Sequence, residues 1–228
     1  MTDATEVQTT PSAPPTPREA WERLRHGNQR FVEGTVQHPS QDAGRRAELT
    51  VAQHPFAVVF GCSDSRVAAE IIFDQGLGDA FVVRTAGHVI DTTVLGSIEY
   101  GVDILGASLV VVLGHDSCGA VAAAAHTLET GEQAGGFVRA VVDRVIPSIV
   151  NITASGRNVR GEDGEVDPDL LRREHVRHTV SMLHSYSAGL ASAVAEGRCA
   201  VVGVEYSLTE GQARLVEVLG DVGEDPIA

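Results

Sequence analysis

Short runs of β-branched and aromatic residues recur along the chain without polar alternation. They read FAVVFG (56–61), AFVVR (80–84), SLVVVLGH (108–115) and CAVVGVEYSL (199–208). Apolar runs of this length, without exposed polar positions between them, predict strands that are buried on both faces, as in a parallel sheet.

Segments with helical spacing separate these runs. They read SRVAAEIIFDQG (65–76), TTVLGSIEYGVDILG (92–106) and CGAVAAAAHTLETG (118–131), and a longer apolar stripe predicts a helix over roughly 169–196. Strands that alternate with helices predict an α/β fold with a mostly parallel open sheet flanked by helices. The segment at 204–220 predicts a hairpin that adds an antiparallel edge strand.

The chain begins with a segment of different character. Residues 1–17 are rich in Thr, Pro and Ala and have no apolar period, so they predict a disordered tail. The Gly-rich and charged stretch at 155–167 predicts a surface loop. We expect a single domain over residues 18–225.

An N-terminal helical arm is predicted ahead of the sheet. Trp21, Leu24 and Phe31 recur at helical spacing between Pro17, which suits a helix start, and Gly34, which suits a helix end. Either the core of the same chain or a partner subunit must cover this apolar stripe.

The charge balance narrows the choice of partners. The chain has 17 Lys and Arg against 31 Asp and Glu, a formal net charge of −14, which argues against nucleic acid and anionic membranes. No apolar run is long enough to cross a bilayer, and the first residues lack the apolar region of a signal peptide. Three widely separated cysteines predict reduced thiols rather than disulfides. We therefore expect a cytoplasmic protein.

Two potential metal ligands follow strand runs, and a third lies close by. Cys62 ends the first run and His115 ends the third, so both are expected at the carboxyl edge of the sheet, where functional residues of open α/β sheets gather. Cys118 follows three residues after His115. Two thiolates and one imidazole suit zinc, and three protein ligands leave a fourth position open for chemistry. Cys199, at the start of a separate run, is expected to be a packed thiol.

Asp64 and Arg66 follow Cys62 at alternate positions and complete the predicted site. Asp64 could accept a hydrogen bond from a zinc-bound hydroxide and orient it, while Arg66 would keep Asp64 ionised. Asp64 is also close enough in sequence to swing onto zinc and replace the water. Lower pH would favour that closed state.

The motifs CSDSR (62–66) and HDSCG (115–119) resemble the CxDxR and HxxC patterns of the β-class carbonic anhydrases. Longer stretches, EIIFDQGLGDAFVVRTAGHVID (70–91) and VLGSIEYGVDILGASLVVVLGHDSCGAV (94–121), are similar to bacterial members, and the resemblance covers about 21–220. It implies reversible hydration of CO2 to bicarbonate and a proton, with one Zn²⁺ per chain. It also implies that Cys62, His115 and Cys118 bind zinc and that Asp64 and Arg66 form the orienting pair.

The same resemblance implies a set of substrate-binding residues. Gln53 would hydrogen-bond bicarbonate, and Phe81 and Tyr100 would line an apolar CO2 pocket. Gly119 is also expected to be a substrate-binding residue. Such residues often come from the neighbouring subunit, which implies a homodimer or tetramer with the arm around Trp21 clasping the partner.

Three positions depart from the family pattern and leave the subtype open. Thr85, His88 and His175 stand where many members carry asparagine. These departures bear on regulation by bicarbonate and leave the zinc ligands unchanged.

Three alternatives fit parts of the pattern. A related zinc hydrolase could act on carbonyl sulfide or carbon disulfide, and a non-catalytic zinc-stabilised module would not need the Asp64–Arg66 pair. A redox sensor would release zinc and join Cys62 to Cys118, although no CxxC motif supports it.

Overall fold

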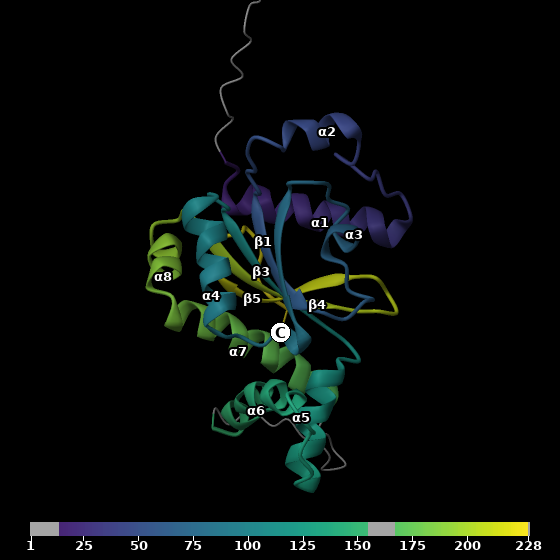
Figure 1. Ribbon diagram of the computed structural model, residues 1–228, viewed down its shortest axis with the longest axis vertical. Coiled ribbons are helices and arrows are strands. Elements are labelled where there is room, and N and C mark those ends of the chain that lie inside the picture. The colour runs from purple at the N-terminus through teal and green to yellow at the C-terminus, as the bar shows by residue number, and fades with distance from the viewer. Residues whose placement is uncertain (1–13, 155–166, 228) are drawn as a thin grey trace, which may run out of the picture.

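A five-stranded sheet lies at the centre of the computed structural model, which describes residues 14–154 and 167–227. The strand order is β2-β1-β3-β4-β5, with parallel pairing throughout except for the antiparallel β4–β5 pair (Figure 1). The α/β fold with an antiparallel edge strand is thus confirmed. The strands are β1 (Ala57–Cys62), β2 (Ala80–Thr85), β3 (Leu109–His115), β4 (Ala200–Tyr206) and β5 (Ala213–Leu219).

Burial along the strands follows their place in the sheet. Every residue of β1, β3 and β4 is buried, as the continuous apolar runs predicted. In β2 five residues are partly buried and Arg84 is exposed, because β2 is an edge strand. The prediction that its run is covered on both faces was therefore wrong.

Helices cover both faces and one end of the sheet. They are α1 (Pro17–Glu33), α2 (Ala43–Glu48), α3 (Ala69–Ile72), α4 (Thr92–Glu99), α5 (Gly119–Thr130), α6 (Val138–Ala154), α7 (Pro168–Tyr186) and α8 (Ala188–Ala195). A π-helical turn at Tyr100–Ile104 continues α4, and a short 3₁₀ turn lies at Ala86–His88.

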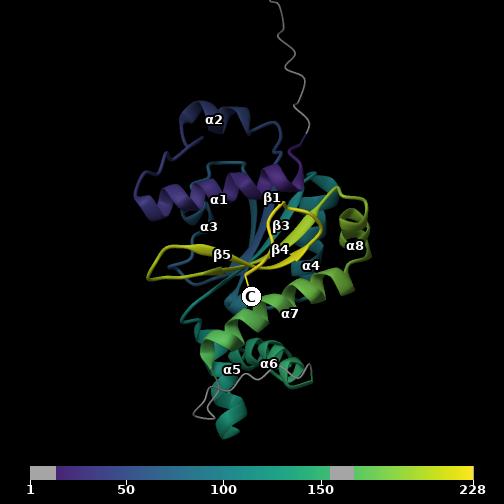
Figure 2. The ribbon, with the colours of Figure 1, turned by 180° about the vertical axis from the view of Figure 1, so that it is seen from behind.

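Alternate strand residues supply two separate apolar cores. Val59 and Val111 face α1 and α3, whereas Val58 and Val110 face α4, α7 and α8. A third cluster joins Cys62 and the start of α5 to α6 and α7. In both views, α5 and α6 lie together at the end of the molecule opposite α1 and α2 (Figure 1 and Figure 2).

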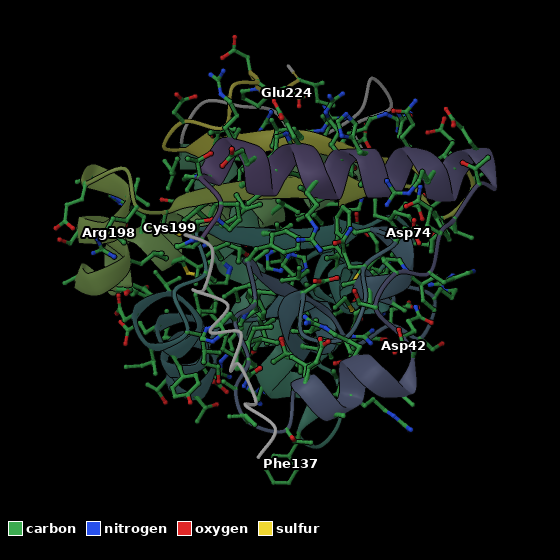
Figure 3. The ribbon with its side chains drawn as sticks, turned by 90° about the horizontal axis from the view of Figure 1, so that it is seen from above. Asp42, Asp74, Phe137, Arg198, Cys199 and Glu224 are labelled. Carbon is green, nitrogen blue, oxygen red and sulfur yellow. The ribbon has the colours of Figure 1, made fainter. Side chains whose placement is uncertain are left out.

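The N-terminal helix packs on the core of its own chain. Helix α1 begins at Pro17 and ends before Gly34, as the sequence predicted, and Gly34 has the left-handed conformation. Thr16 and Glu19 add a capping box that was not predicted. Trp21 and Leu24 are fully buried in the first core. Trp21 donates from Nε1 to Glu224 at 2.8 Å, and Glu224 lies on the C-terminal segment beside α1 (Figure 3). The core of the same chain thus covers Trp21 and Leu24, which is one of the two covers expected for the stripe. That the arm also clasps a partner stays a prediction.

Two predicted helices have different bounds from those expected. The helix expected over 65–76 is reduced to the four residues of α3, which ends before Asp74, a residue with a φ of 46°. The helix expected over 169–196 is interrupted at Ser187, whose extended backbone begins α8 and whose hydroxyl caps Leu190 N. Helices α2 and α6 were not predicted.

The remaining sequence predictions concern the N-terminal tail, the loop at 155–167, membrane-spanning helices and the location of the protein. Most of the predicted tail (residues 1–13) and of the predicted loop (155–166) lies outside the described residues. Within the described ranges, no helix is both long and apolar enough to cross a membrane. The cytoplasmic location stays a prediction.

Candidate metal centre

Three side chains converge at the carboxyl edge of the sheet. Cys62 is the last residue of β1, His115 the last of β3, and Cys118 immediately precedes α5. One ligand atom from each, two Sγ atoms and an imidazole nitrogen, lie within 4.8 Å of one another, and all three residues are buried. The convergence predicted from the strand ends is confirmed.

The state of His115 fits a metal ligand. Its Nδ1 lies 2.7 Å from the backbone oxygen of Asp116, so Nδ1 carries the proton and donates it to that carbonyl. The other nitrogen, Nε2, is buried and has no hydrogen-bond partner among the described residues. A backbone carbonyl that accepts from one ring nitrogen, and so leaves the other free for the metal, is usual for histidine bound to zinc.

The two thiols also fit zinc. All three cysteines are free, and thiolate is the form that binds metal. A hydrogen bond from the Cys118 thiol lowers the pKa of Cys62, against the effect of burial. The same contact and burial raise the pKa of Cys118. Burial alone would lower the pKa of His115, but the sulfur of Cys62 beside it raises that pKa.

Asp64 and Arg66 form the predicted pair at the rim of this cluster. Arg66 donates from Nε to Asp64 Oδ1 at 3.0 Å and from Nη2 to Oδ2 at 2.7 Å, a bidentate contact. These hydrogen bonds hold the pKa of Asp64 well below its usual range. Asp64 Oδ2 lies 4.0 Å from His115 Nε2, so the carboxylate faces the metal ligands.

Arg84 supports the backbone of the first motif and was missed by sequence reasoning. It donates to the backbone oxygen of Cys62 at 3.0 and 2.9 Å and to that of Asp64 at 2.7 Å. Arg84 could have been found from the sequence, because it lies near the end of the predicted strand run at 80–84 and is therefore expected at the same edge of the sheet as Cys62.

A second missed contact comes from a backbone N–H group. Gly87 donates from its N–H to Cys62 Sγ at 3.3 Å. Its φ is 67°, and a Cβ there would lie 2.6 Å from Ala120 Cβ, so only glycine fits. No sequence motif marks this donor.

His175 departs from the family pattern and lies behind this turn. His175 Nε2 is 2.8 Å from the backbone oxygen of Gly87, and Nδ1 is 2.7 Å from Ser148 Oγ. Burial lowers the pKa of His175 to about 4, so the ring is neutral near pH 7. His88 packs against it with ring centroids 4.3 Å apart.

Three predicted substrate-binding residues lie away from the metal ligands of their own chain. Phe81 is four residues before Thr85, the residue of β2 that pairs with Cys62, so it lies roughly 13 Å away along the strand. Tyr100 packs on Phe81, with ring centroids 6.1 Å apart. Gln53 is exposed and precedes β1, also at the amino edge of the sheet.

Gly119 and Cys199 lie where the sequence suggested. Gly119 begins α5 beside Cys118, is exposed, and a Cβ there would meet no atom within 4 Å. Cys199 is buried just before β4, and burial raises the pKa of its thiol to about 12. Figure 3 shows Cys199 beside Arg198, near α8.

Comparisons with known proteins agree with this site. A family model described as carbonic anhydrase matches residues 57–213. Carbonic anhydrase 2 of Mycobacterium tuberculosis (strain H37Rv) is 53% identical over 209 residues, which cover 92% of this chain and 97% of the relative. The carbonic anhydrase of Mycolicibacterium smegmatis is 55% identical over 208 residues, or 91% and 97% of the two chains.

Solved structures show the same fold at lower identity. The β-carbonic anhydrase CcaA aligns with a TM-score of 0.65 and 24% identity over 87% of this chain and 88% of its own. The Coccomyxa β-carbonic anhydrase in complex with acetazolamide also gives 0.65 at 24% identity, over 76% and 78% of the chains.

The chain belongs to the β-class carbonic anhydrases. Its activity is that of a carbonate dehydratase, which interconverts CO2 and bicarbonate, and Cys62, His115 and Cys118 form a zinc site, the one cluster of this kind among the described residues. This activity excludes the non-catalytic zinc module. The comparisons do not bear on the redox sensor or on the carbonyl sulfide or carbon disulfide hydrolase, which stay alternatives.

Proposed function

We propose that hydration of CO2 takes place at the open position beside Cys62, His115 and Cys118, and that Asp64 and Arg66 orient the attacking water there. The observation that carries this proposal is the place of Asp64. Its Oδ2 is 4.0 Å from His115 Nε2 while Arg66 holds both carboxylate oxygens.

Each residue has a distinct task in the reaction. Zinc, when bound, supplies the Lewis acidity that makes water a nucleophile near neutral pH. Cys62, His115 and Cys118 would bind it, and three protein ligands would leave one coordination position open for chemistry. Asp64 accepts a hydrogen bond from the attacking water, so that an oxygen lone pair points toward the CO2 carbon. Water and CO2 give bicarbonate and a proton, which leaves to the solvent buffer.

Arg66 keeps Asp64 in the accepting form. The bidentate contact fixes the plane of the carboxylate and stabilises its charge, so Asp64 does not take up the proton that the reaction releases. Arg66 Nη2 also lies 3.4 Å from the backbone oxygen of Ser117, between His115 and Cys118. The pair thereby ties the two metal-binding motifs together. Asp64 is also close enough to occupy the fourth position itself, which would close the site.

Replacement of Asp64 tests this role. Asp64→Asn keeps the shape of the side chain but removes its charge and makes it a hydrogen-bond donor, so kcat/KM for CO2 hydration should fall by about a hundredfold or more. Zinc content should stay at the wild-type level.

The control is Asp143→Asn, which breaks an exposed Asp–Arg pair on α6, with 3.6 Å between Arg139 Nε and Asp143 Oδ2. It should leave the rate unchanged. An Asp64→Asn protein with full activity and the wild-type pH response would contradict both the orienting and the closing role of Asp64.

We further propose that Gln53, Phe81 and Tyr100 act in the active site of a second copy. They lie at the amino edge of the sheet, roughly 13 Å or more from their own metal ligands. Gln53 is exposed and Tyr100 is 47% exposed, so both side chains are available to another subunit. Gly119 lies open beside Cys118, where it can face substrate in its own chain.

A homodimer is therefore the smallest catalytic assembly in this proposal. The two Sordaria macrospora β-carbonic anhydrases that share the fold, at 22% identity and a TM-score of 0.63 over 75% of this chain and 84% of theirs, are tetrameric. A tetramer built from two such dimers is compatible with the same composite sites.

A further inference from the structure

A buried chain of hydrogen bonds leads from α6 to the metal ligand Cys62. Ser148 on α6 contacts His175 on α7, His175 contacts the carbonyl of Gly87, and the N–H of Gly87 contacts Cys62 Sγ. Ser148 and His175 are each 1% exposed. These hydrogen bonds thus join four separate elements, α6, α7, the 3₁₀ turn and β1, at the metal centre.

The partners of His175 fix the position of its proton. Nε2 lies 2.8 Å from a carbonyl oxygen, which only accepts, so Nε2 must carry the proton and donate it. Nδ1 is then an acceptor, and the Ser148 hydroxyl donates to it at 2.7 Å. The Gly87 carbonyl therefore fixes the tautomer, and Ser148 holds the ring in the orientation in which Nε2 reaches Gly87.

The Gly87 turn needs an external anchor. Gly87 has a φ of 67°, and His88, which follows it, has a φ of 41°. Glycine adopts this conformation without a steric cost, but His88 carries a side chain and does so only where surrounding contacts hold it. The Thr85 hydroxyl, which donates to Val89 O at 3.0 Å, closes the turn on one side. His175 contacts the carbonyl of Gly87 in the middle of the turn.

We propose that His175, oriented by Ser148, is a positioning residue for Cys62. By holding the Gly87 carbonyl, it keeps the Gly87 N–H on the sulfur of Cys62. This inference rests on the proposed function, because it takes Cys62 as a ligand of the catalytic zinc.

The chemical consequence concerns the charge of the metal centre. Two thiolates neutralise Zn²⁺ and weaken its effect on bound water, whereas an N–H donor draws charge from one sulfur and restores part of that effect. Partners of this kind around metal ligands typically change metal affinity or activity by 10–100-fold. His175 acts through Gly87, so we expect a change at the lower end, about tenfold.

The test uses cobalt- and zinc-loaded full-length protein, without an activity assay. Cobalt bound to a thiolate gives a sulfur-to-cobalt charge-transfer band, which reports directly on charge at Cys62 and Cys118. Zinc affinity is measured by competition with a chelator. The variants are His175→Leu, which removes the donor, His175→Gln, which keeps a donor in a similar place, and Ser148→Ala.

Thr179→Val is the matched control. Thr179 is fully buried one turn further along α7 and donates to the backbone oxygen of His175 at 2.7 Å, but it does not take part in the chain to Cys62. It reports the effect of disturbing α7 alone.

We expect His175→Leu to shift the charge-transfer band and to weaken zinc binding by about tenfold. His175→Gln should lie close to wild type, and Ser148→Ala should give a smaller loss in the same direction. If His175→Leu matches Thr179→Val in both readouts, His175 only packs the core and the inference is overturned. If His175→Leu does not fold, Ser148→Ala decides in the same way.

Failure of the proposed function would look different. Wild-type protein without any sulfur-to-cobalt band would contradict the assignment of the metal ligands before any variant is made. A wild-type band that His175→Leu leaves unchanged would overturn only the role of His175.

Discussion

At the scale of single residues, the metal centre depends on a glycine that belongs to no metal-binding motif. Gly87 donates to Cys62 Sγ and packs against Ala120, the second residue of α5. Two separate features require glycine at this position, namely the positive φ and the short distance to Ala120. The cost of losing each feature can be measured as a change in the free energy of unfolding, with one substitution and a suitable control.

Gly87→Ala should destabilise the protein more than Gly34→Ala. Gly34 has almost the same φ, 68°, but a Cβ there meets no atom within 4 Å, so the control carries only the backbone cost of about 1–2 kcal/mol. Gly87→Ala should lose a further 1–3 kcal/mol or so through the clash with Ala120. Denaturant unfolding of both variants measures the difference.

Zinc affinity gives a second readout for the same pair. It should fall for Gly87→Ala, because the N–H shifts away from Cys62, and stay at the wild-type value for Gly34→Ala. Equal losses of unfolding free energy, with equal zinc affinity, would contradict the role given to Gly87.

The residues found from sequence are those whose side chains carry the chemistry. Cys62 and His115 end apolar strand runs and Cys118 follows at short spacing, so the parallel-sheet rule alone brings them to one edge. Gly87 acts through a backbone N–H, which leaves no signature in its residue type. Ser148 and His175 meet only because α6 packs against α7, and α6 was not predicted.

At the scale of elements, the N-terminal helix is part of the fold rather than an appendage. Leu24 is fully buried and Trp21 is 2% exposed, both against side chains of the sheet and α3. Burial of such side chains is worth about 1.5–3 kcal/mol each. The helix therefore contributes to the stability of each chain on its own.

Leu24→Ala measures that contribution. It removes a fully buried side chain and should lower the free energy of unfolding by about 2–5 kcal/mol. Val32→Ala on the same helix, where Val32 is 47% exposed, should change it by about 0.5 kcal/mol or less. Similar small losses for the two variants would show that α1 does not pack as described.

Element boundaries were predicted less well than element types. The sheet and its antiparallel edge follow from the apolar runs and the terminal hairpin pattern. The run of β2 looks the same as the runs of β1 and β3, because local sequence does not state which strand lies at the edge. Likewise, the apolar stripe continues through Ser187, and only its extended backbone and its contact with Glu99 separate α7 from α8.

At the scale of the whole molecule, the two edges of the sheet carry the two groups of residues that the proposal combines into one site. The carboxyl edge holds the metal ligands with Asp64 and Arg66, and the amino edge holds Gln53, Phe81 and Tyr100. A single chain keeps these two sets of residues apart. The substrate-binding roles that the family resemblance implies for Gln53, Phe81 and Tyr100 therefore require a second copy of the chain. The resemblance named these residues and implied a second subunit, but the distance between the two sets within one chain became visible only in the structure.

Mixed oligomers test the composite site. A chain carrying Asp64→Asn is co-expressed with a chain carrying Gln53→Ala, with different tags so that mixed dimers can be isolated. If Gln53 serves the partner, a mixed dimer has one site with the wild-type Asp64 of one chain and the wild-type Gln53 of the other. Each parent alone should be impaired, and the mixed dimer should regain the activity of one intact site.

The alternative gives a different result for the same sample. If Gln53 serves its own chain, both sites of the mixed dimer carry one substitution each and no activity returns. A mixture of two differently tagged Asp64→Asn chains controls for effects of co-expression and should remain inactive.

The most direct test of the central claim follows CO2 hydration by stopped flow on one preparation, with zinc content measured on the same sample. The protein is assayed as purified, after removal of zinc with a chelator, and after zinc is returned. The account predicts one zinc per chain and a rate that is lost and regained with the metal. Full activity of the zinc-free protein, or no activity at one zinc per chain, would contradict it.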